Sequence, residues 1–100
     1  MIVSAWNNGS YKKTGGGYGI RIRKIDRDQY FEKKRDFITI QIDNEEVQIN
    51  ISSSFWNKCP ELRSEKIGKW LINKGYQKWP KGKPPKFRLI PMNKYKFMLI

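Results

Sequence analysis

The fold is decided by the stretch ITIQIDNEEVQINIS, residues 38–52, in which isoleucine or valine occupies alternate positions on both sides of a polar tetrapeptide. Successive side chains of a strand point to opposite faces, so this alternation predicts two strands that each bury one face. The tetrapeptide, residues 43–46, predicts a four-residue loop between antiparallel strands. The expected unit is a β-hairpin with an isoleucine-rich inner face. Its outer face would carry Thr39, Gln41, Gln48 and Asn50.

A second alternating segment lies upstream, over residues 18–23. Tyrosine and isoleucine alternate there with Gly19, Arg21 and Arg23, which predicts a strand with one buried face. If this strand pairs into the sheet of the hairpin, Arg21 and Arg23 join its polar outer face. Residues 1–6 predict a further short apolar strand.

The segment between these two strands is rich in glycine, with residues 15–17 all glycine and with Lys12 and Lys13 close by. Backbone amides of such turns can hold phosphate. Nucleotide-binding fingerprints require a helix after the glycines, however, and here a strand follows. We therefore expect a flexible hairpin loop, with a mobile basic clamp for a phosphate backbone as the less favoured alternative.

One main helix is expected at about residues 61–74. Its apolar stripe follows helical spacing and consists of Ile67, Trp70 and Leu71. Pro60 fits a first helical position, and a start capped by Ser64 is the alternative. Gly75 is the expected stop, in the left-handed conformation after the last turn.

The remaining segments connect or complete the sheet. Residues 24–36 mix charges of both signs and predict an exposed connection with about one helical turn. Residues 79–86, rich in proline, glycine and lysine, predict a stiff basic loop. Residues 87–91 and 95–100 predict a C-terminal pair of strands joined by a tight turn. The prediction is one α+β domain, residues 1–100, with a small mostly antiparallel sheet, open or curled into a partial barrel, and one main helix.

The positive charge is concentrated in the second half of the chain. The net charge is +12, of which residues 1–50 carry +2 and residues 51–100 carry +10. After Glu65 there is no Asp or Glu, whereas ten Lys or Arg residues follow. Such a one-sided field attracts anionic partners and predicts binding that weakens steeply with salt.

The rare residue types limit the chemistry. The chain has one cysteine, Cys59, and no histidine, which argues against zinc sites and against catalysis with a histidine base. We expect no metal, no cofactor and no catalytic residue, and we expect Cys59 to be a small buried apolar side chain. A single cysteine, the lack of a signal-peptide pattern and the lack of a long apolar run predict a cytoplasmic protein with no membrane partner.

The favoured function is non-catalytic nucleic-acid binding, with DNA slightly ahead of RNA. Lysine and arginine neutralise phosphates, and exposed aromatic rings stack on unpaired bases. Trp79 is the aromatic residue expected to stack, with anchoring of its loop to the core as an equal alternative. The predicted binding residues are Arg21, Arg23, Lys66, Lys69, Lys74, Lys78, Trp79, Lys81, Lys83, Lys86 and Arg88.

Two alternatives remain open at the level of the sequence. A small basic ribonuclease of the toxin type has the same size and charge, and it would use Lys, Arg, Tyr or Glu without a metal. An inhibitor or adaptor that binds an acidic protein surface also fits the charge. The first predicts RNA cleavage, and the second predicts no nucleic-acid affinity at moderate salt.

Overall fold

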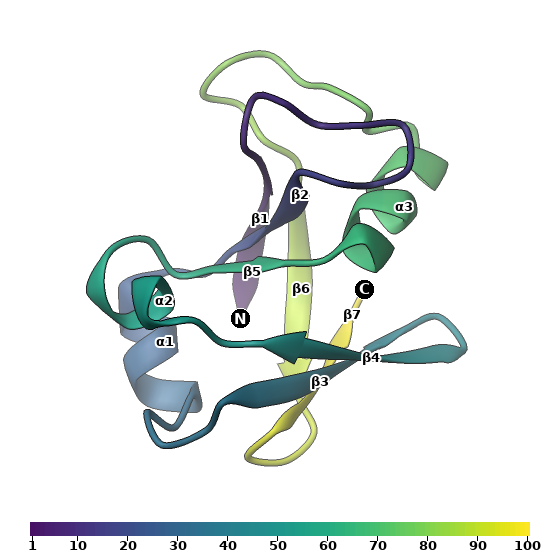
Figure 1. Ribbon diagram of the computed structural model, residues 1–100. Helices are drawn as coiled ribbons and strands as arrows, with labels where there is room; N and C mark the ends of the chain where they lie inside the picture. The colour runs from purple at the N-terminus through teal and green to yellow at the C-terminus, as the bar shows by residue number, and fades with distance from the viewer.

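The isoleucine alternation produces the hairpin at the centre of the fold. In the computed structural model, which describes residues 1–100, β3 (Phe37–Ile42) pairs antiparallel with β4 (Glu45–Asn50) (Figure 1). The buried positions face one another across the ladder, with Ile38 opposite Ile49. The connection is a two-residue turn and not the expected four-residue loop, because Ile42 pairs directly with Glu45. Asp43 adopts φ 53° in this turn, a conformation that Asp tolerates better than most residues.

The predicted C-terminal strand pair forms and joins the hairpin. The strands β6 (Lys86–Pro91) and β7 (Lys96–Leu99) are antiparallel to each other. β7 then lies parallel to β3, with Ile40 opposite Phe97. The sheet is therefore mixed, with this single parallel pair among otherwise antiparallel neighbours.

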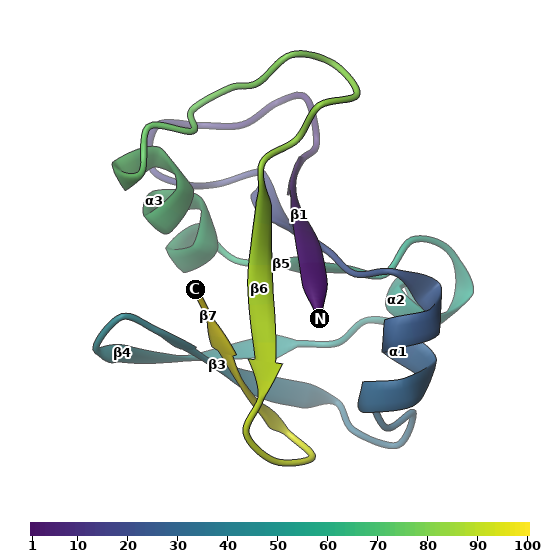
Figure 2. The same ribbon diagram turned by 180° about the vertical axis from the view of Figure 1, so that it is seen from behind.

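Three strands complete the sheet, namely β1 (Ile2–Asn7), β2 (Tyr18–Arg21) and β5 (Glu61–Arg63). The order is β4-β3-β7-β6-β1-β2-β5, and the two edge strands β4 and β5 approach each other. The seven strands thus curl into a nearly closed sheet around one hydrophobic core (Figures 1 and 2). β2 ends at Arg21, two residues earlier than expected, so Arg23 lies outside the sheet.

Three helices lie outside the sheet, where one main helix and about one helical turn within residues 24–36 were expected. The longest is α3 (Glu65–Asn73), and residues 61–63 of the predicted helix belong to β5 instead. Ser64 caps α3 by accepting a hydrogen bond from the Lys66 amide at 3.1 Å, as the alternative start predicted. Gly75 has φ 90°, and the amides of Gly75 and Tyr76 donate to the last turn, which ends the helix as predicted.

The two short helices form within segments that show no helical periodicity. They are α1 (Lys24–Tyr30) and α2 (Ser53–Asn57). Helices of this length are unstable alone. Here the Arg27 guanidinium donates to the carbonyls of Phe55 and Trp56 at 3.2 and 3.1 Å, so each helix stabilises the other. None of the three helices has the length and apolarity needed to cross a membrane.

The glycine-rich loop is held against α3 by a backbone contact. A Cβ at Gly68 would lie 2.0 Å from the Gly15 carbonyl oxygen, and a Cβ at Gly15 would lie 2.3 Å from the Glu65 carbonyl oxygen. Internal hydrogen bonds, such as Lys12 N–H to Gly16 O at 2.8 Å, also order the loop. The glycines therefore allow the helix to approach the loop closely.

We predict that Gly68→Ala destabilises the protein by about 1–3 kcal/mol, because the new methyl group overlaps the Gly15 carbonyl and the helix must move away. Urea unfolding followed by circular dichroism measures the loss. Asn73→Ala, on an exposed position of the same helix, is the control and should change stability by no more than about 0.5 kcal/mol. Equal stability of the two variants would contradict this view of the contact.

Candidate nucleic-acid interface

Three of the predicted binding residues are neutralised by carboxylates. Arg21 pairs with Glu61, Arg23 pairs with Asp26, and Lys66 pairs with Glu45 at 2.8 Å. The hydrogen bond and the negative charge of Glu45 raise the pKa of the Lys66 ammonium above its ordinary value. These cations are therefore weaker anion sites than the sequence suggested.

A group of unpaired cations lies at one end of the curled sheet. Figures 1 and 2 show the loop between β1 and β2, residues 8–17, beside the loop between α3 and β6, residues 74–85. We call these two loops the loop end. Exposed lysines without an ion-pair partner gather there, and the Glu65 carboxylate lies beside Gly16. These lysines are Lys12, Lys13, Lys74, Lys78, Lys81 and Lys83.

Aromatic rings join the two loops. The Tyr18 ring lies 5.1 Å from that of Tyr11 and 6.3 Å from that of Trp79, and the Tyr18 hydroxyl donates to the Gln77 carbonyl. Burial, and secondarily Tyr11, raises the pKa of Tyr18. Trp79 is half-buried and packs against the core, as its anchoring alternative predicted. The structure therefore shows Trp79 as a fixed point of the α3–β6 loop.

The lysines of the α3–β6 loop are presented by a defined turn. The Lys83 amide donates to the Pro80 carbonyl at 3.0 Å, and Gly82 has φ 77°, as a turn with glycine at its third position requires. The Ala5 amide donates to the Pro85 carbonyl at 2.9 Å and fixes the end of the loop beside β1. The C-terminal end of the loop is therefore held to β1, and Trp79 anchors the other side of the turn on the core.

The outer face of strands β6, β1, β2 and β5 carries a second group of cations. Lys86 donates to the Ser4 hydroxyl at 2.7 Å, and Ser4 lies opposite both Lys86 and Arg21 in the ladder. Arg88 is exposed two residues further along β6, on the same face as Lys86. Trp6 and Arg63 share this face, and neither was predicted as a binding residue. The alternation of β1 could have placed Trp6 on the outside, whereas β5 is too short to show a period.

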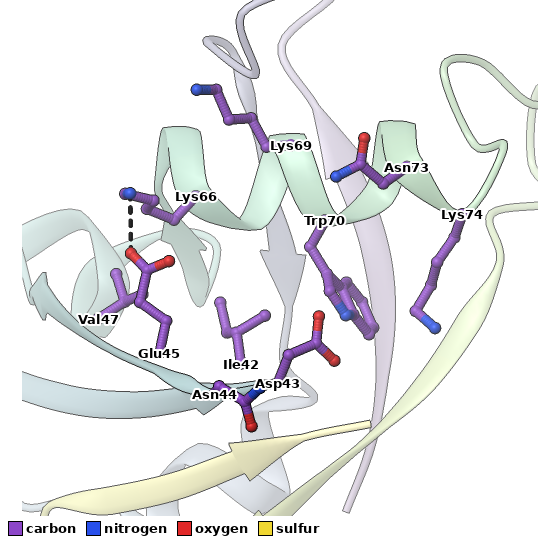
Figure 3. Close-up of a pocket in the computed structure, with 10 residues that line it drawn as sticks. All are labelled: Ile42, Asp43, Asn44, Glu45, Val47, Lys66, Lys69, Trp70, Asn73 and Lys74. Carbon is purple, nitrogen blue, oxygen red and sulfur yellow. Dashed lines mark ion pairs between the residues drawn. The ribbon is translucent and has the colours of Figure 1, made fainter.

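A groove of about 580 Å³ separates the β3–β4 turn from α3 (Figure 3). Trp70 forms its apolar wall, and the Lys74 ammonium lies 4.8 Å from the centre of the Trp70 rings. Three lysines line the groove, and Asp43 and Glu45 bring negative charge to the same lining. Its mixed charge makes the groove a poorer site for a polyanion than the loop end.

The structure adds little to the chemistry available for catalysis. Cys59 is exposed, so the expectation of a buried cysteine is wrong. No three side chains of Asp, Glu or Cys converge in a way that could hold a metal ion. No protein-family model, curated protein or solved structure matches the chain, so the functional argument depends on its own surface.

We predict that Tyr18→Phe destabilises the protein by about 1 kcal/mol, because the Gln77 carbonyl loses its donor. Thermal unfolding measures the change, and Tyr30→Phe, at an exposed position without a hydrogen bond, is the matched control. The pKa of Tyr18 is higher in the folded state than its ordinary value of 10.0. The contribution of the neutral phenol to the free energy of unfolding is therefore complete below pH 10.0, and it is lost as the pH rises through the folded-state pKa. The difference between wild type and Tyr18→Phe should therefore shrink above pH 10.0. A constant difference would exclude this role of the phenol.

Proposed function

We propose that the protein is a non-catalytic nucleic-acid-binding domain, with DNA ahead of RNA as its ligand. The observation that carries the proposal is that cations paired with carboxylates and cations without such a partner lie on different parts of the surface. The pairs Lys66–Glu45 and Lys96–Glu46 lie near the β3–β4 turn, whereas the loop lysines have no carboxylate partner. The six unpaired lysines of the loop end, together with Lys86 and Arg88, thus form the largest group of unpaired cations on neighbouring parts of one surface.

The geometry of this surface suits a phosphate backbone. Lys81 and Lys83 extend from one turn, and Lys86 follows at the start of β6, so positive charge continues from the loop end onto the outer face of the sheet. Lysine acts as a point charge on phosphate and releases condensed counterions when it binds. Lys12 and Lys13 extend the same field from the neighbouring loop.

We also propose a cytoplasmic location. The single cysteine is exposed and has no partner for an intrachain disulfide, which suits a reducing compartment.

The test is fluorescence anisotropy with labelled duplex DNA, single-stranded DNA and RNA over a series of salt concentrations. For wild type, log K should fall linearly with log salt. The variant Lys81→Ala/Lys83→Ala/Lys86→Ala should flatten the slope by about 2–3, because each lost phosphate contact removes roughly 0.7–0.9 from it.

The matched control removes three exposed, unpaired lysines away from the loop end, in the variant Lys24→Ala/Lys58→Ala/Lys94→Ala. It loses the same net charge and should keep most of the wild-type slope. Absence of binding by wild type to all three ligands at low salt would overturn the proposal. Equal slopes in the two triple variants would contradict the assigned surface.

A further inference from the structure

The outer face of the sheet holds a stacked pair of side chains that no core contact explains. The guanidinium carbon of Arg63, on β5, lies 4.6 Å from the centre of the Trp6 rings, on β1. Trp6 is half-buried, yet it is not among the side chains that pack against the core. The pair is therefore built on the surface of the sheet.

Glycine in the intervening strand makes this contact possible. Trp6 lies opposite Gly19 in the β1–β2 ladder, and Gly19 lies opposite Arg63 in the β2–β5 ladder. Because Gly19 has no side chain, the tryptophan and the arginine can meet across the strand between them. A Cβ at Gly19 would also lie 2.3 Å from the Leu62 carbonyl oxygen, so the close approach of β5 requires glycine here.

A buried carboxylate fixes the arginine. One oxygen of Glu61 accepts from Arg63 at 3.0 Å, and its other oxygen accepts from Arg21. The Glu61 side chain is only 6 % exposed, whereas Arg21 and Arg63 are 50 % and 62 % exposed. Glu61 therefore orients two guanidinium groups that keep their outward N–H groups and planes accessible to solvent.

The surroundings of this cluster favour an anionic ligand. Glu61 begins a row of laterally paired residues that crosses β5, β2, β1 and β6 and continues with Arg21, Ser4 and Lys86. Lys86 joins this face to the basic turn of the α3–β6 loop. Glu61 is the single carboxylate on this row, and it is already shared by two arginines. This face thus combines positive charge, hydrogen-bond donors and the planar Trp6–Arg63 stack.

We propose that this face binds single-stranded nucleic acid by stacking an unpaired base on the Trp6–Arg63 pair, while Arg21, Lys86 and Arg88 contact the flanking phosphates. The proposal rests on the proposed function and specifies its ligand. Aromatic rings and guanidinium planes both stack on bases, and the stack tolerates any base because every base has a π-face. The bases of a duplex already stack on one another, so a duplex would use only the phosphate contacts. Glu61 acts as a positioning residue for the two arginines.

Arg63→Lys separates stacking from charge, because lysine keeps the positive charge and loses the planar group. We expect the variant to bind a dT12 oligonucleotide about 10-fold more weakly than wild type at the same salt. Its salt slope should be unchanged, and its affinity for a 12-base-pair duplex should stay within about 2-fold. Trp6→Leu should show the same selective loss. Arg35→Lys is the matched control, because the Arg35 guanidinium lies 4.6 Å from the centre of the Tyr95 ring, outside the proposed face, and its replacement should leave both affinities unchanged.

Competition anisotropy with the two ligands, after circular dichroism has verified folding, measures each of these effects. If Arg63→Lys and Arg35→Lys bind dT12 equally well, while removal of the loop lysines still flattens the salt slope, the base platform is wrong and the proposed function stands. If wild type prefers the duplex to dT12, the platform is likewise overturned. If neither oligonucleotide binds at low salt, the proposed function fails as well.

Discussion

The parallel pairing of β7 with β3 is the constraint on which the rest of the structure depends. β3 belongs to the isoleucine hairpin in the middle of the chain, and β7 is the last strand. Their ladder places Ile40 opposite Phe97 and Ile42 opposite Leu99, so the hairpin and the C-terminal strands bury one common core. Through β6 and β1 this pairing makes a single sheet of all seven strands. Without it the hairpin would be a separate two-stranded unit, which is marginally stable at best.

The sequence predicted the elements whose signal is local. Alternation identified the inner faces of β3 and β4, and the residues around Ser64 and Gly75 marked the ends of α3, although Pro60 also suggested an earlier start. The sequence predicted about one helical turn within residues 24–36, where α1 lies, but α2 and β5 could not be found in this way. α1 and α2 depend on hydrogen bonds from Arg27 across 28 and 29 residues, and β5 has only three residues. The parallel pairing depends on the register of strands that are far apart in the chain, which no local pattern encodes.

The proposed binding surface was likewise predictable only where its signal is local. Counting charges located the basic half of the chain, but the partners that neutralise individual cations are tertiary neighbours. Glu45 precedes Lys66 by 21 residues, and Glu61 follows Arg21 by 40. Arg63 and Trp6 were missed because their contact passes over Gly19 and exists only in the folded sheet. Lys81 and Lys83, by contrast, lie in the stiff basic loop that composition alone predicted at residues 79–86.

The stiffness of the α3–β6 loop affects the kinetics of any association at this surface. Trp79 packs on the core, the Lys83 amide closes the turn, and the Pro85 carbonyl is bound to β1. Proline further reduces the conformational freedom of the chain here. The conformational entropy of ordering the backbone of this loop is therefore lost when the protein folds, and not when a ligand arrives. A polyanion meets charges that are already in place, so its association rate depends on diffusion and electrostatic steering, with no folding step to wait for.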